Sequence, residues 1–362
     1  MRQIFVKLHL WLGLSIGLLW ALQGLSGSWL VFHREVEHAG LAVEVGPMTS
    51  LNTILANAKA ARKTDPIRIS IADKTGDILN VVFKKGHEPL KLAAFSGRVL
   101  ALEPTLAERI NETLYKFHEE LLSGERGKNL VGISGLLLMS SALMGLALGW
   151  PKRRSWVAAF TPRQWKTTKM RLYGWHRASG LLACSALTVC AVTGATMIWA
   201  KDLRSAFAAA VPYETPYRPK PVKFLRSVVL SPDQALAIAK MQFPTAGFVR
   251  LMMPTKEAPV YQFRLHQSGE IRAWSGVTSV TVDPFTGAVL DTYDPLKAPI
   301  SNWWFDAVFP LHNGEALGLI GRLLVGFAGL SLPMFYVTGV FVWWRTRRRG
   351  VHNIDVGASA AI

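Results

Sequence analysis

Residues 174–200 read GWHRASGLLACSALTVCAVTGATMIWA, a run with one histidine and one arginine near its start and no acidic residue. At about 1.5 Å per helical residue, such a run is long enough to cross roughly 30 Å of hydrocarbon. Three more apolar runs of comparable length lie at about 8–32, 130–150 and 316–344. The sequence therefore predicts an integral membrane protein built on an all-α, four-helix transmembrane bundle.

The first apolar run is expected to stay in the mature protein. It is too long for the h-region of a signal peptide, and no small-x-small cleavage site follows it. If residues 9 to 33 were one straight helix, they would span about 36 Å.

The net charge of +17 is concentrated in the short connections between the apolar runs. The two long connections, 34–117 and 201–311, carry nearly balanced acids and bases. Because basic residues in short loops stay in the cytoplasm, we expect both termini and the middle loop there, and the long connections outside. This placement argues against a nucleic-acid partner. The basic residues concerned are Arg2, Lys7, Lys152, Arg153, Arg154, Arg163, Lys166, Lys169, Arg171, Arg177, Arg345, Arg347, Arg348 and Arg349.

Histidines recur at matching places in the two halves of the chain. His9 and His176 open the first and third runs, and each is followed four residues later by glycine. His118 and His312 precede the second and fourth runs, and each is followed by Gly-Glu. An internal repeat of this kind predicts pseudo-twofold symmetry about the membrane normal, so equivalent histidines would meet in pairs.

Paired imidazoles at the ends of bundle helices are typical axial ligands of haem iron. We therefore take His9 with His176, and His118 with His312, as candidate haem ligands; interfacial or surface histidines are the alternative. His33 is a reserve ligand at the outer face. Arg322 is a lone charge inside the fourth run, where a haem propionate or a backbone carbonyl could be its partner.

The long connections have the pattern of small α+β units. In the second, Ser231-Pro232-Asp233 predicts a helix start, and strands are expected near 260–265, 276–282 and 288–293. In the first, we expect a helix at 51–62 and strands near 67–71, 78–83, 90–95 and 98–102.

Several short motifs resemble a known family. Asp283-Pro284-Phe285-Thr286-Gly287, with the flanking segments 231–244 and 280–294, looks like a PepSY domain. The histidine motifs Leu8-His9 with Gly13, Phe117-His118-Glu119-Glu120 with Gly124-Glu125, and Leu311-His312 with Gly314-Glu315 resemble the PepSY-associated transmembrane family. The first outer segment departs from the pattern, having only Ser96-Gly97 at the turn, and is interpreted as a degenerate copy.

This resemblance implies a fold with two small α+β PepSY-like extracytoplasmic domains, haem b (two per chain) and a bacterial inner-membrane location. It also implies reduction of a ferric siderophore on the periplasmic side, with iron acquisition as the role. The electron donor would be a cytoplasmic molecule or a quinol, because no nucleotide-binding fingerprint is present. The alternative is a haem-free PepSY protein that binds or regulates a periplasmic partner such as a peptidase. A proton-coupled transporter is disfavoured, because we find no acid well inside any apolar run.

The predicted organisation has eight parts. They are a first transmembrane helix (1–33), a degenerate PepSY-like domain (34–117), a second helix with an outer extension (118–151), a basic cytoplasmic loop (152–172), a third helix (173–200), a PepSY domain (201–311), a fourth helix (312–345) and a cytoplasmic tail (346–362).

Overall fold

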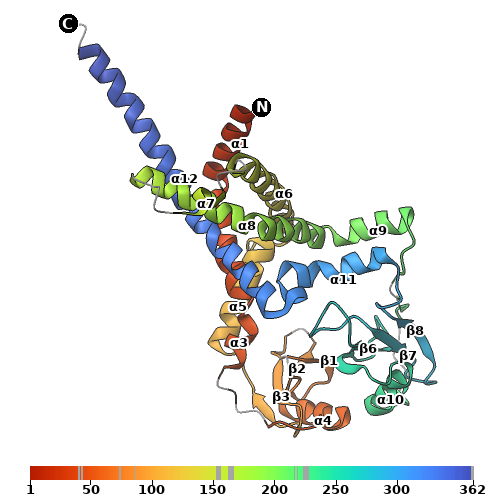
Figure 1. Ribbon diagram of the computed structural model, residues 1–362. Coiled ribbons are helices and arrows are strands. Elements are labelled where there is room, and N and C mark those ends of the chain that lie inside the picture. Colours follow the sequence, from red (N-terminus) through yellow and green to blue (C-terminus); the bar gives the residue numbers. More distant parts are fainter. Residues whose placement is uncertain are drawn as a thin grey trace. The chain divides into compact units, whose positions relative to one another are not determined.

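The computed structural model describes residues 1–39, 41, 44–72, 75–84, 86–151, 156–161, 167–215, 217, 219–222 and 228–359. Most of the predicted basic loop therefore lies outside the described residues. The chain forms two compact units (Figure 1). The first, here the helical unit, comprises Met1–Val31, Thr113–Ala200 and Leu311–Ile362; the second, the outer-segment unit, comprises Phe32–Glu112 and Lys201–Pro310.

Three helical segments of the helical unit are long and apolar enough to cross a membrane. They are α6 (Gly124–Gly149), α8 (Thr168–Ile198) and Glu315–Arg347, which joins the 3-10 helix η2 (Glu315–Leu317) to most of α12 (Gly318–Ser359). A fourth span results if α1 (Arg2–Ser15) and α2 (Gly17–Leu30) cross together. These segments coincide with the four predicted apolar runs.

The first span is not the straight helix that the sequence suggested. α1 and α2 meet at Ile16 with a bend of 65°. The Ser15 hydroxyl donates to the carbonyl of Trp11 at 2.7 Å, a contact that bends helices. Gly17 has so little room that an added Cβ would lie 2.8 Å from Tyr336. A serine and a glycine flanking the break are a usual cause of a kink, so the 36 Å expectation does not hold.

Small residues let the helices of this unit approach closely. Gly24 of α2 and Gly329 of α12 face each other so tightly that a Cβ on Gly24 would lie 2.4 Å from the Gly329 carbonyl oxygen. Beside them, the Ser28 hydroxyl donates to the carbonyl of Gly326 at 2.9 Å. Such contacts hold helices together where burial of apolar surface gives little driving force.

The outer-segment unit contains one eight-stranded antiparallel sheet with the order β4-β3-β2-β1-β5-β6-β7-β8. Its first half has α4 (Leu51–Arg62), β1 (Pro66–Ile71), β2 (Ile78–Phe83), β3 (Leu90–Ala93) and β4 (Val99–Ala101). Its second half has α10 (Pro232–Gln242), β5 (Gly247–Met252), β6 (Tyr261–His266), β7 (Ser279–Val282) and β8 (Val289–Tyr293). Four further helices are α3 (His33–His38), α5 (Leu106–Glu120), α9 (Ala200–Ala210) and α11 (Ile300–His312), and α7 (Trp156–Phe160) is a short helix of the helical unit.

The expectation of two separate outer domains is therefore wrong. β1 pairs with β5 through Ser70 opposite Arg250, so the two segments are halves of one sheet. One apolar core, including Ile69, Leu251 and Phe263, runs beneath both halves and is covered by α4 and α10. A free β1 or β5 would be an exposed edge, and pairing the two removes both edges. β5 itself was missed in the sequence.

Candidate functional site

The structure brings the four candidate histidines together as two pairs. In the first pair, the imidazole centroids of His9 and His176 are 6.2 Å apart. In the second pair, those of His118 and His312 are 6.1 Å apart. Each pair joins residues from opposite halves of the repeat, as the sequence predicted.

Neighbouring helices hold the rings of the first pair. His9 lies on α1, and its Nδ1 is 3.0 Å from the carbonyl oxygen of Ser141 and 3.0 Å from the Ser141 hydroxyl. His176 lies on α8, and its Nδ1 is 2.9 Å from the hydroxyl oxygen of Thr338. That hydroxyl donates its own proton to the carbonyl of Met334 at 2.6 Å, so it accepts from His176.

The second pair is held in the same way. His118 Nδ1 lies 3.0 Å from the carbonyl oxygen of Gln23 and 3.1 Å from the Ser26 hydroxyl. His312 Nδ1 lies 3.0 Å from the carbonyl oxygen of Cys190 and 3.1 Å from the Thr193 hydroxyl. A carbonyl oxygen can only accept, so in both histidines Nδ1 carries the proton.

All four imidazoles thus share one tautomer when neutral. With the proton on Nδ1, the lone pair of each ring is on Nε2, the atom that binds a metal. A second-shell acceptor on Nδ1 is the usual way in which proteins orient a metal-ligating histidine. The arrangement supplies two pairs of oriented nitrogen ligands.

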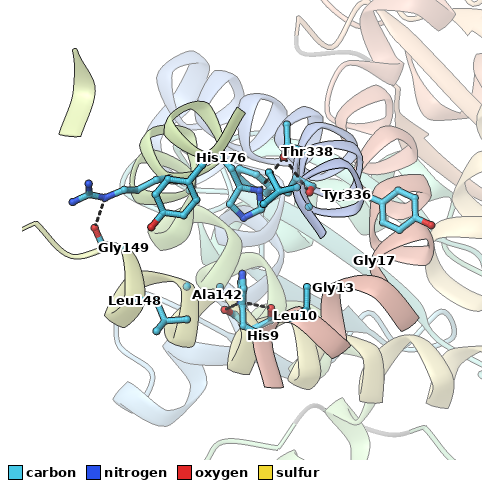
Figure 2. A pocket seen from close by; sticks show the side chains of 18 of the residues that line it. His9, Leu10, Gly13, Gly17, Ala142, Leu148, Gly149, His176, Tyr336 and Thr338 are labelled. Atoms are coloured by element: carbon cyan, nitrogen blue, oxygen red, sulfur yellow. Dashed lines mark hydrogen bonds between the residues drawn. The ribbon is translucent and has the colours of Figure 1, made fainter. Parts of the chain in front are cut away.

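A cavity of about 450 Å³ surrounds the first pair (Figure 2). Its volume lies within the roughly 300–1,000 Å³ typical of cofactor sites. Six glycines line it. At three of them, Gly13, Gly180 and Gly339, an added Cβ would meet no atom within 4 Å. Side chains at these positions would occupy the cavity. Arg2 and Arg177 also line it and supply positive charge.

The ring spacing can be compared with that of haem ligation. Two iron–nitrogen bonds of about 2 Å and roughly 1 Å from each nitrogen to its ring centre place the centroids about 6 Å apart. Both observed separations agree with this value. Among the described residues, no group of three or more His, Cys, Asp and Glu side chains is arranged to hold a bare metal ion. The ring spacing of both pairs and the glycine-lined cavity at the first pair fit a flat macrocycle.

The two remaining candidates lie outside both pairs. His33 begins α3 in the outer-segment unit, and its carbonyl accepts from the Asn111 side chain at 3.4 Å. Arg322 is 2% exposed on α12, and its Nη2 donates to the carbonyl oxygen of Val31 at 2.6 Å. A backbone carbonyl, one of the two partners expected for Arg322, is thus present at the end of α2.

Sequence reasoning missed the residues that orient the rings. Ser26 and Thr193 place hydroxyl groups 3.1 Å from the Nδ1 atoms of His118 and His312. A Cβ on Gly27 would lie 2.8 Å from the Cε1 of His118, and a Cβ on Gly194 would lie 3.2 Å from the Cε1 of His312. A signal was present in the repeat. Gln23, Ser26 and Gly27 follow His9 at the same intervals as Cys190, Thr193 and Gly194 follow His176.

The fold and these sites define a multi-pass helical membrane protein with two internally repeated histidine sites. The chain belongs to the family described as the PepSY-associated TM region, whose sequence profile matches residues 6–346. No curated protein matches the chain.

Proposed function

We propose that this protein is a haem-b-containing reductase of the bacterial inner membrane, which passes electrons across the membrane to a ferric siderophore in the periplasm. The observation that carries the proposal is the close pair of imidazoles, twice repeated, in which every Nδ1 is hydrogen-bonded and Nε2 is the nitrogen left to bind a metal. A membrane anchor has no use for this arrangement.

Haem held by two imidazoles would supply one-electron transfer. His9 and His176 would hold one group, and His118 and His312 the other. Arg2 and Arg177 line the first cavity and are suited to haem propionates. Arg322 would combine its contact to Val31 with a propionate of the second group. Both termini would be cytoplasmic, in keeping with the basic short connections.

The proposed substrate is a ferric chelate, and each bound Fe(III) takes up one electron to become Fe(II). Fe(II) binds hard oxygen donors more weakly, so reduction releases iron without breaking the chelator. The electrons would come from a quinol or a cytoplasmic reductant.

We further infer that the two halves of the eight-stranded sheet are PepSY-type copies, the second of which keeps the Asp-Pro-x-Thr-Gly turn. In it, Asp283 Oδ1 accepts from the backbone N–H of Phe285 at 2.7 Å.

A haem-free protein that binds or regulates a periplasmic peptidase is the other candidate function. The α+β sheet is compatible with it, and the histidine pairs would then be structural. Optical spectra separate the two functions.

The decisive experiment is a dithionite-reduced minus oxidised spectrum of the purified chain with haem quantified per chain. We expect two low-spin b-type haems, one of which is lost in His176→Ala and the other in His312→Ala. His266→Ala, which changes a histidine outside both pairs, serves as the control and should keep both. A colourless protein from haem-replete cells would overturn the reductase proposal and favour the regulatory one.

A further inference from the structure

A row of polar side chains crosses the face of the sheet opposite α4 and α10. Asn80, Ser70, Arg250, Arg264 and Ser279 are successive directly opposed partners on β2, β1, β5, β6 and β7. Directly opposed residues of antiparallel strands point to the same face of the sheet. Their chain neighbours Leu251 and Phe263 are buried in the apolar core on the other face, so this row lies on the second face.

Three arginines cluster at the centre of this face. Arg250 and Arg264 are directly opposed, and Arg68 lies two residues before Ser70 on β1. All three are half-buried. Among the described residues, none of the three forms a salt bridge within 4 Å, and the Nε of Arg68 is buried without a hydrogen-bond partner. Like charges directly opposite each other destabilise a sheet unless something neutralises them.

The surrounding acids act on this cluster only from a distance, since none of those described forms an ion pair with it. Burial, followed by the neighbouring Arg250, lowers the pKa of Arg264 to about 10. The two acids that raise this pKa already have partners. Asp306 Oδ2 accepts from the Tyr293 hydroxyl at 2.7 Å, and the Glu270 carboxylate accepts from the backbone N–H groups of Gln267 and Val277 and from the Thr278 hydroxyl.

The same row contains a cation that the fold does neutralise. Lys91 on β3 is directly opposite Asn80 and is 7% exposed. Its Nζ lies 2.8 Å from a carboxylate oxygen of Glu108. Burial acts to raise the pKa of Glu108, but hydrogen bonds from Lys91 and from the Thr105 backbone bring it below its usual value. The buried cation on β3 thus has a dedicated counterion, Glu108 of α5, whereas among the described residues Arg68, Arg250 and Arg264 form no such ion pair.

We propose that Arg68, Arg250 and Arg264 form a binding site for a soluble multivalent carboxylate anion. Guanidinium groups bind carboxylates in a planar, bidentate manner, and two opposed arginines present several donors from one surface. Partial exposure leaves the three groups accessible from solvent. Identification of this anion as a carboxylate-bearing ferric chelate rests on the proposed reductase function; anion binding itself does not.

The test uses the full chain in detergent, with citrate, iron(III) citrate and inorganic phosphate as probes in calorimetry. We expect citrate to bind, and Arg250→Gln and Arg264→Gln each to raise its dissociation constant about tenfold or more, since each removes charge-assisted hydrogen bonds. The matched control is Arg98→Gln, because Arg98 is exposed and already paired with Glu44 at 3.5 Å. This control should bind citrate as the native chain does.

Thermal unfolding gives a second readout. Citrate should raise the apparent melting temperature of the native chain and have a much smaller effect on Arg264→Gln, whose melting temperature without anion should equal or exceed the native value. Equal citrate affinity in the native chain and both arginine variants would overturn the site. Tighter binding of phosphate than of citrate would overturn the carboxylate assignment.

The reductase proposal and the anion site can be contradicted independently of each other. If iron(III) citrate binds through Arg250 and Arg264 but the dithionite-reduced protein forms no Fe(II), the anion site stands and the reductase proposal is contradicted. If an uncharged ferric trihydroxamate is reduced equally by the native chain and Arg264→Gln while reduction of iron(III) citrate slows, both proposals stand.

Discussion

The two histidine pairs are alike in ring spacing and different in their surroundings. The glycines four residues after His9 and His176, Gly13 and Gly180, face open space, and with Gly339 they line a cavity. Around His118 and His312, by contrast, Gly27 and Gly194 press against the imidazoles. The first pair has one such close contact as well, because a Cβ on Gly145 would lie 3.1 Å from the Cε1 of His9. The difference between the pairs is therefore the three open glycines that line the cavity at the first pair. The two pairs thus share a ring spacing and differ in the glycines around them.

The largest expected effect comes from filling the cavity of the first pair. Gly180→Leu places a side chain where no atom now lies within 4 Å of the Cβ position. We expect complete loss of the haem of the first pair and retention of the other, measured as haem per chain and by redox titration. Leu182→Phe, an enlargement at a 61% exposed position of the same helix, is the control. Two haems in Gly180→Leu would show that the cavity is not the haem site.

The sequence predicted the four apolar segments and which histidines meet, because apolar runs and repeated motifs are local features. The helix 51–62 and the strand 78–83 have the predicted bounds. The break at Ile16 was missed, because apolar residues continue on both sides of it and the run reads as one helix. β5 and the joining of the two halves were missed as well, since pairing of β1 with β5 depends on segments far apart in the chain.

The hydrogen bonds from the histidines to threonine hydroxyl groups can be compared between the two pairs. His176 Nδ1 bonds to the Thr338 hydroxyl, whereas His312 Nδ1 has the Cys190 carbonyl in addition to Thr193. We therefore expect Thr338→Val to weaken haem binding at the first pair roughly 10- to 100-fold. It should also raise the midpoint potential there, because a less basic ligand favours Fe(III) less. Thr193→Val should have a much smaller effect at the second pair, and equal effects of the two variants would contradict this ranking.

Arg322 distinguishes a structural role from a cofactor role at the second pair. Arg322→Met removes the bonds from Nε and Nη2 to the Val31 carbonyl and leaves that oxygen without these donors. We expect a loss of about 1–3 kcal/mol in stability, seen as a lower apparent melting temperature. We also expect faster loss of haem from the second pair when detergent-purified protein is washed. A lower melting temperature with unchanged haem retention would show that Arg322 only stabilises the end of α2.

The smallest expected effect is at the close contact behind His312. In Gly194→Ala the new methyl group lies 3.2 Å from the His312 Cε1, so the ring must move by a few tenths of an ångström. The Cys190 carbonyl still accepts from Nδ1, and haem should therefore stay bound. We expect a modest shift in the midpoint potential and low-spin spectrum of the second pair and none at the first. Gly13→Ala is the matched change at the first pair, where the methyl group meets open space. An equal response to both variants would remove the distinction between glycines that make room and glycines that support a ring.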